Sequence, residues 1–175
     1  MTGRYEIVQR ILRREGGVAD VGDGKGVTRY GQTVEWLREF GLSTPRDADD
    51  AAENYTIWMA RTRLDRLIAP HGADALADAV IDLAVHSGHT IAILALQRVV
   101  GTATDGVIGP ATIAAANVDR TRAAAGVVAW RMEQHARLIA GNPARYAKFA
   151  VGWARRCAEH VRAIGGERGD LSAKG

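Results

Sequence analysis

Glycines and prolines divide this chain into helix-sized segments, and this punctuation constrains its fold more than any other feature. Gly16-Gly17 and Gly88 each end a segment whose apolar residues recur at helical spacing. Pro110 and Pro143 stand where further helices begin. No segment alternates apolar and polar residues for long enough to predict a half-buried strand. We therefore expect a mostly α fold.

The expected helices follow from this punctuation. They cover residues 4–15, 34–40, 44–67, 72–88, 91–100, 110–116, 119–141 and 142–166. Thr44 is expected to cap the third helix, with Pro45 at its first position, and Asp119 to cap the seventh. Residues 18–33 contain four glycines and no helical period, which predicts an ordered loop or small hairpin. The polar tail after Gly166 is expected to fray.

Length and composition exclude several classes of protein. The chain has 175 residues, 47% of them hydrophobic and 25% charged, which fits a folded domain and not a disordered or coiled-coil chain. Its longest apolar stretch, residues 90–96, is far shorter than the roughly 18 to 20 residues of a membrane span. Cys157 is the only cysteine, so neither an internal disulfide nor a cysteine-based metal site can form. We expect no stable membrane insertion.

Charge is distributed unevenly along the sequence. Up to Gly88 there are 11 Lys and Arg against 14 Asp and Glu, a net charge of −3; beyond it there are 12 against 6, a net charge of +6. A basic second part indicates attraction to a polyanion, which could be nucleic acid, anionic lipid or a bacterial wall polymer. We expect residues 1–88 to form one segment and residues 89–175 a second helical segment, packed into the same compact domain.

Glu15 is the first candidate for a chemical role. It continues the apolar series Val8, Ile11, Leu12 at helical spacing, so it should project from the buried stripe of its helix. Burial of a carboxyl group favours its protonated form, as a general acid working near neutrality requires. The alternative is a helix-end carboxylate that turns to water or pairs with a neighbouring arginine.

A glycine-rich loop follows Glu15 and carries Asp20, Asp23 and Thr28. Its glycines allow positive φ angles, so the loop can fold Asp23 and Thr28 back towards Glu15. The spacing lacks the twelve-residue pattern and terminal glutamate of a calcium loop. It also lacks the glycine spacing of nucleotide-binding loops. We therefore expect no metal and no cofactor.

Four blocks of this sequence resemble glycoside hydrolase family 108, the lysozyme-like muramidases of phage endolysins. The first is Glu15-Gly16-Gly17 with the Asp and Thr downstream; the second is the run 81–88. Leu96-Gln97 with residues 105–112 resembles the associated peptidoglycan-binding segment, and Phe149 with residues 152–156 resembles the C-terminal block. The blocks occur in the family's order and cover nearly the whole chain. The resemblance implies a lysozyme-like helical fold.

The resemblance also implies an activity, cleavage of the β-1,4 bond between N-acetylmuramic acid and N-acetylglucosamine during host lysis. It makes Glu15 the catalytic acid, with Asp23 and Thr28 as helpers that orient water or stabilise the charged sugar. Asp20 is the alternative helper, because Lys25 interrupts a glycine pair that the family usually has. Thr28 could instead close the loop through its own backbone contacts.

Substrate-binding residues are expected among the aromatic side chains and one histidine. Tyr30, Tyr55 and Trp58 could stack on sugar rings. His86, where the family more often has Asn, could donate a hydrogen bond to a sugar or lie near Glu15, or it could be a histidine with its hydrogen bonds satisfied at a helix end before Gly88. The tryptophans on apolar helix stripes are expected in the core: Trp36, Trp130 and Trp153. Five arginines could hold the anionic wall: Arg120, Arg122, Arg131, Arg155 and Arg156.

Other functions stay open at this point. A non-catalytic wall-binding protein needs only residues 105–112 and the basic second part, and a lytic transglycosylase would use Glu15 to form an anhydro product. A nucleic-acid binder is disfavoured, because no helix carries clustered Lys and Arg. The first residues lack an uninterrupted apolar signal-peptide core, which suggests storage in the host cytoplasm until a holin gives access to the wall. We expect a monomer whose partner is peptidoglycan.

Overall fold

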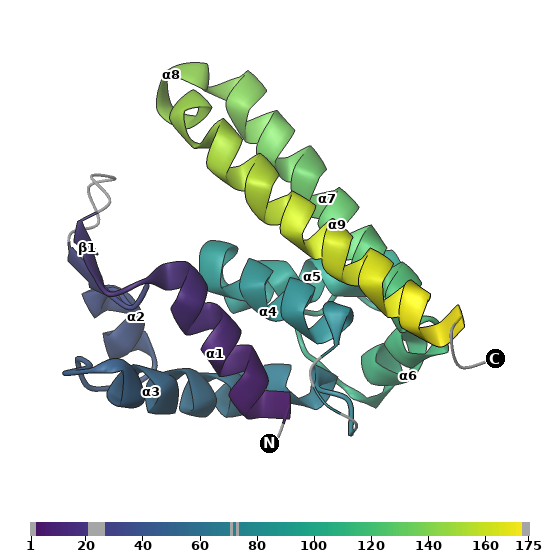
Figure 1. The fold of residues 1–175 in the computed structure, drawn as a ribbon, viewed down its shortest axis with the longest axis horizontal. Coiled ribbons are helices and arrows are strands. Elements are labelled where there is room, and N and C mark those ends of the chain that lie inside the picture. The colour runs from purple at the N-terminus through teal and green to yellow at the C-terminus, as the bar shows by residue number, and fades with distance from the viewer. Residues whose placement is uncertain (1–2, 21–26, 71, 73, 173–175) are drawn as a thin grey trace. The chain divides into compact units, whose positions relative to one another are not determined.

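A computed structural model of the protein describes residues 3–20, 27–70, 72 and 74–172 (Figure 1). The chain divides into two compact units, Met1–Ala73 and Asp74–Gly175. The division precedes helix α4 (Ala75–Ser87), whereas the charge pattern was divided after it, at Gly88. The predicted mostly α fold class is confirmed, and so is the small hairpin after the first helix.

The first unit contains a hairpin set among helices. In chain order its elements are α1 (Gly3–Glu15), β1 (Val18–Asp20), β2 (Val27–Arg29), α2 (Val34–Glu39), α3 (Ala48–Arg61) and the 3-10 helix η1 (Leu64–Leu67). The strands are antiparallel, and Val18 pairs with Arg29 and Ala19 with Thr28. The apolar stripe of α1 packs against α3, so the hairpin is held beside a two-helix core.

Helix α3 begins later and ends earlier than its sequence pattern predicts. Asp47, not Thr44, is the N-cap, and its side chain accepts hydrogen bonds from the backbone N–H groups of Asp49 and Asp50. The side chain of Asp50 also binds Arg46, which accounts for a non-helical turn before Asp47. The predicted single helix to residue 67 is therefore wrong. It breaks at Arg63, whose φ is 61°, and resumes as η1.

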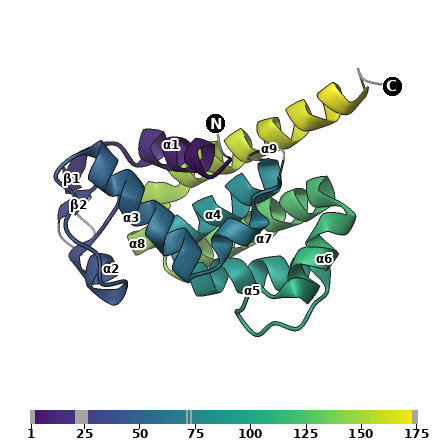
Figure 2. The ribbon, with the colours of Figure 1, turned by 90° about the horizontal axis from the view of Figure 1, so that it is seen from below.

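The second unit is built around α4. Its other elements are α5 (His89–Val100), α6 (Pro110–Val118), α7 (Arg120–Gly141), α8 (Pro143–Tyr146), the 3-10 helix η2 (Ala147–Phe149) and α9 (Ala150–Ser172). Residues 75–84 of α4 are all buried, as expected of a helix with apolar residues on every side, and they include Asp78 and Asp82. Helix α4 packs against α5, α7 and α9, and α7 lies alongside α9. Figure 2 shows the loop that joins α5 to α6.

The C-terminal helices depart from the prediction in two places. The expected single helix 142–166 is divided into α8, η2 and α9, and α9 continues through Gly165-Gly166 to Ser172. A helical glycine costs about 1 kcal/mol. Ile164, only 7% exposed, is buried in the same turn and helps to offset that cost. Asp119 caps α7 as predicted, accepting a hydrogen bond from the N–H of Arg122.

Two further observations concern the described residues. Cys157 is buried on α9, with 2% of its surface exposed. Within residues 3–20, 27–70, 72 and 74–172, no helix has the length and apolar character needed to cross a bilayer.

Candidate functional site

Glu15 is the last residue of α1, at the point where the chain turns into the hairpin. Ile7, Val8 and Ile11 are the buried stripe of this helix, and Glu15 lies half-buried at its end. Gly16 takes a φ of 69°, and its N–H donates to the carbonyl of Leu12 at 3.1 Å. This left-handed glycine ends the helix directly after Glu15. Glu15 therefore lies where helix α1 meets the loop.

The returning strand passes directly against Glu15. Tyr30 and Gly31 follow β2 with φ angles of 55° and 76°, and the N–H of Tyr30 donates to the carbonyl of Gly17 at 2.8 Å. A Cβ atom added to Gly31 would lie 2.8 Å from both Cγ and Oε2 of Glu15. Only glycine leaves room for the carboxylate in this position. The backbone at Gly31 therefore forms one wall of the site.

Buried polar side chains support the turn at Tyr30 and Gly31 through hydrogen bonds. The Tyr55 hydroxyl donates to the carbonyl of Tyr30 at 2.7 Å. Next to it, Gln32 donates to the carbonyl of Ala51 at 3.0 Å and accepts from Asn54 Nδ2 at 2.8 Å. Gln32, Asn54 and Tyr55 are all buried, so these bonds are shielded from water. They connect the turn beside Glu15 to helix α3.

An aromatic cluster underlies the same turn. The ring of Trp36 lies 5.6 Å from that of Tyr55 and 5.7 Å from that of Trp58, measured between centroids. Tyr55 and Trp58 are each 1% exposed, so we assign them no direct contact with a sugar. Tyr30 is partly exposed and adjoins the wall formed by Gly31. Of the three aromatic residues expected in the groove, it alone is placed to meet a ligand in this structure.

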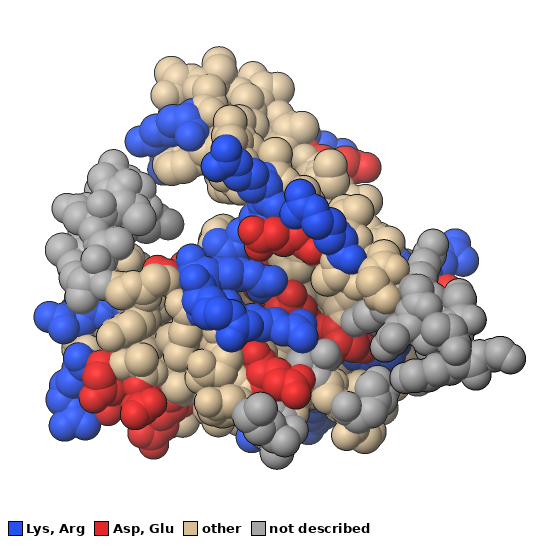
Figure 3. Space-filling view, viewed as in Figure 1, with Lys and Arg blue, Asp and Glu red and all other residues tan. Residues whose placement is uncertain are grey.

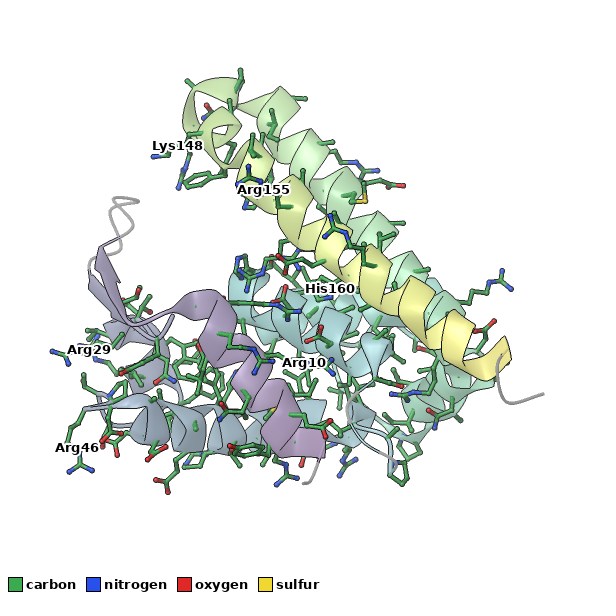
Figure 4. The ribbon with its side chains drawn as sticks, viewed as in Figure 1. Arg10, Arg29, Arg46, Lys148, Arg155 and His160 are labelled. Atoms are coloured by element: carbon green, nitrogen blue, oxygen red, sulfur yellow. The ribbon has the colours of Figure 1, made fainter. Side chains whose placement is uncertain are left out.

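The remaining predicted site residues are in different surroundings. Asp23 and the glycines around it fall outside the described residues, and with them the calcium-loop alternative. Thr28 lies in β2, half-buried and opposite Ala19. Arg29, labelled in Figure 4, points away from the hairpin. His86 is an exposed residue in the last turn of α4, in the second unit, and its role stays a prediction.

The block at residues 105–112 is held together by a single buried glutamine. Gln97 Nε2 donates to Asp105 Oδ1 at 2.6 Å and to the carbonyl of Val107 at 3.1 Å, while Gln97 Oε1 accepts from the N–H of Gly106 at 3.0 Å. The bond from Gln97 holds the pKa of Asp105 below its ordinary value. Ile108, fully buried, anchors the middle of the loop. These residues shape the α5–α6 connection.

The sequence does not single out the ion cluster at the centre of the second unit. Asp82, 1% exposed, accepts from Arg131 Nη1 at 2.6 Å and from Arg156 Nη2 at 2.9 Å. His160, labelled in Figure 4, places Nε2 3.1 Å from Asp82 Oδ2 and Nδ1 3.5 Å from Asp78 Oδ2. Two of the four resemblance blocks thus meet here, through Asp82 and Arg156. Two aspartates, Asp78 and Asp82, within an otherwise largely apolar helix were the available signal.

The charge state of this cluster follows from its bonds. Burial by itself raises the pKa of Asp82, but the hydrogen bonds from His160 and Arg156 and the charges of Arg156 and Arg131 outweigh it. The pKa of Asp82 is held well below its ordinary value. The carboxylate is therefore ionised and ties α4 to α7 and α9.

Several of the arginines expected to face the wall are used internally. Arg131 and Arg156 bind Asp82, and Arg120 binds Asp74, with Nη2 2.8 Å from Oδ1. Arg122 and Arg155 are exposed. Figure 3 shows basic side chains spaced along the arm of α8 and α9 rather than gathered in one patch. Arginine count alone therefore overstates the charge available to a polyanion.

Comparison with known proteins identifies one part of the chain by sequence. Residues 91–158 match the family described as "Predicted Peptidoglycan domain". The match associates this chain with peptidoglycan. It spans the block ordered by Gln97, all of α7 and the first turns of α9. No curated protein matches the chain.

Among solved structures, the fold resembles that of SagA from Brucella abortus. The two chains share 25% identity with a TM-score of 0.73, and the similarity covers 93% of this chain and 94% of the other. The likeness therefore extends through both units, including the first unit, which lies outside the matched peptidoglycan family.

Proposed function

We propose that this protein is an N-acetylmuramidase that cuts the β-1,4 bond between N-acetylmuramic acid and N-acetylglucosamine. One observation carries the proposal: the Glu15 carboxyl group is held at the end of α1 against the backbone of Gly31. A half-buried carboxyl group in a fixed place is what a general acid requires. The peptidoglycan association of residues 91–158 supplies the substrate class.

In the proposed reaction Glu15 donates its proton to the leaving sugar oxygen. The positive charge that develops on the ring then requires a carboxylate or an activated water. Asp23 takes this part, with Asp20 as the alternative, and Thr28 orients the water or the sugar. Tyr30, partly exposed beside Gly31, stacks on a sugar ring.

Stereochemistry depends on the separation of the two carboxyl groups. A separation of roughly 5 to 5.5 Å leads to retention, and one of roughly 6.5 to 9.5 Å admits a water and leads to inversion. The anomer formed first, followed by NMR, measures this outcome directly.

Mass spectrometry of the soluble products from purified peptidoglycan tests the activity. We expect reducing muramyl ends from the wild type and none from Glu15→Gln. Glu35→Gln, an exposed residue in the first turn of α2, is the matched control and should leave the products unchanged. Anhydro ends would instead show that the enzyme is a lytic transglycosylase that uses the same acid.

A non-catalytic wall-binding protein is the second candidate, favoured by the family match of residues 91–158 alone. Release of no product by the wild type, together with sedimentation on insoluble peptidoglycan, would establish this function in place of the muramidase. If the protein still bound peptidoglycan at high salt, exposed arginines would also be excluded as its main contacts with the wall.

The lytic role is a separate part of the proposal and rests on the resemblance to phage endolysins. The enzyme is stored in the host cytoplasm as a monomer and reaches the wall when a holin opens the membrane. Expression in a bacterium with and without a holin tests this, with lysis expected only when both proteins are present. Lysis without the holin would contradict it.

A further inference from the structure

An open groove of about 760 Å³ lies in the second unit, away from the buried ion cluster. Its walls are the end of α5, the end of α6 and the first half of α7. Gly126 makes the arrangement possible, because a Cβ atom there would lie 2.5 Å from Val99 Cγ1. Helices α5 and α7 therefore approach closely at the groove floor. All residues of the groove fall within the range that matches the peptidoglycan family.

The groove carries two arginine side chains on its rim. Arg98 and Arg122 are exposed on its rim, and neither guanidinium group pairs with a carboxylate among the residues that the structure describes. This distinguishes them from Arg120, Arg131 and Arg156, which bind aspartates of α4 or the residue before it. Two such cations on one groove favour a ligand with more than one carboxylate.

Between the arginines the lining is small and apolar. Ala125 and Ala129 present methyl groups from α7, and Val118 is 86% exposed. Asp119 adds one carboxylate, which also caps α7. The groove residues include no aromatic ring, the side chain on which sugars stack. The complementary ligand has carboxylates, short apolar side chains and an amino group.

We infer that this groove binds the peptide stem of peptidoglycan rather than its glycan strand. A stem peptide is short, alanine-rich and carries several carboxylates and an amino group, which matches Arg98, Arg122, the alanine methyl groups and Asp119. The inference rests on the substrate of the proposed function, peptidoglycan, and is independent of the chemistry at Glu15. It gives the matched segment a defined contact with the wall.

Titration of the full chain with two soluble ligands tests the inference. The first is the disaccharide tetrapeptide released from peptidoglycan by a muramidase, and the second is the same disaccharide after an amidase has removed the peptide. We expect the tetrapeptide ligand to bind at least about ten-fold more tightly, as measured by calorimetry. The double variant Arg98→Gln/Arg122→Gln should lose about ten-fold in affinity, since charged hydrogen bonds contribute strongly.

Two further variants make the result specific. Arg137→Gln/Arg162→Gln removes the same charge from exposed positions on α7 and α9, away from the groove, and should change affinity less than about two-fold. Ala125→Trp keeps the charge but fills the groove, and should weaken binding as the arginine pair does. Circular dichroism checks that each variant keeps its helices.

Three outcomes would overturn the inference. They are equal binding of the peptide-free disaccharide, unchanged binding by Arg98→Gln/Arg122→Gln, and a dimer that Val118→Asp dissociates, since a second copy would then occupy the groove. None of these depends on product release, so failure here and failure of the muramidase activity are distinguishable.

Discussion

The two units treat a carboxylate within a resemblance block in opposite ways. In the first unit Glu15 lies half-buried at a helix end, against the glycine backbone of the returning hairpin. In the second, Asp82 is 1% exposed and bonded to Arg131, Arg156 and His160. The first arrangement leaves a carboxyl group beside a surface loop, and the second neutralises one inside a helix bundle. A sequence block can therefore mark chemistry or packing, and burial with its partners distinguishes them.

The same comparison explains the uneven charge of the sequence. Counted by structural unit, the first has 11 Lys and Arg against 11 Asp and Glu, a net charge of 0, and the second has 12 against 9, a net charge of +3. The three acidic residues that change sides are Asp74, Asp78 and Asp82. These are the carboxylates that meet Arg120, His160, Arg131 and Arg156. A boundary at Gly88 therefore assigns these aspartates and the residues that they pair with to different segments.

Asp82→Asn should cause the largest loss of stability. It leaves Arg131, 2% exposed, without its buried counterion, and we expect the free energy of unfolding to fall by about 3–5 kcal/mol in urea denaturation. Glu133→Gln removes an exposed carboxylate 3.5 Å from Arg137 and should have no measurable effect. A similar stability for Asp82→Asn and the wild type would show that the cluster is not needed for folding.

Acidification should weaken the same cluster. The folded-state pKa of Asp82 lies below its ordinary value of 3.8, because bonds from His160 and Arg156 and the charge of Arg131 outweigh its burial. The unfolded chain therefore takes up the proton first, and the stabilisation is lost as pH falls below that value. Urea midpoints at pH 7 and pH 3 measure this. Asp82→Asn should lose less on acidification, and an equal loss would contradict the assignment.

Gly31→Ala tests whether the position of Glu15 in the first unit matters for activity. The added Cβ would displace the Glu15 side chain and cost about 1–2 kcal/mol in backbone strain. A shift of the acid by about 1 Å reduces a rate by about 100-fold, so release of reducing ends should fall to that extent. Gly41→Ala carries similar strain at φ 56° but meets only Arg61 at 3.7 Å. It should keep nearly full activity; equal losses would remove the steric argument.

Tyr55→Phe should have the smallest effect. It removes the 2.7 Å hydrogen bond to the carbonyl of Tyr30 and leaves the ring in place, so we expect a loss of about 1 kcal/mol in thermal unfolding. Tyr5→Phe, at a residue 51% exposed, is the control and should leave stability unchanged. A larger fall in product release than in stability would identify Tyr55 as a positioning residue for Glu15.

Sequence punctuation predicted the helix order and the hairpin because these depend on local signals. Glycine at Gly16 ends α1 and Asp119 caps α7 within the sequence neighbourhood that shows them. The errors arose where two local signals compete or where burial of a neighbouring side chain outweighs a local signal. Thr44 and Asp47 are both acceptable caps, and the bonds of Arg46 with Asp50 choose the second. Burial of Ile164 helps to carry α9 past two glycines.

The sequence named candidate site residues such as Glu15 and Tyr30, but not the contacts that hold them in place. Glu15 follows from the apolar period of one helix, which a single segment contains. Gly31, which contacts Glu15, is 16 residues from it in the sequence, and Tyr55, which supports the same turn, is 40 residues from it. No local pattern reveals these contacts. An aromatic residue such as Tyr55 or Trp58 gives the same sequence signal whether it lines a groove or fills a core. The same applies to Arg131, which composition counts with the surface arginines.

The single thiol of this chain can report how often the second unit opens. Cys157 is 2% exposed, on the helix that also carries Arg156 and His160, and its burial raises the thiol pKa. Because the thiolate is the reactive form, an alkylating reagent modifies Cys157 mainly when α9 separates from its neighbours. The modification rate thus reports how often the bundle opens in the untagged native protein, with no signal from the first unit.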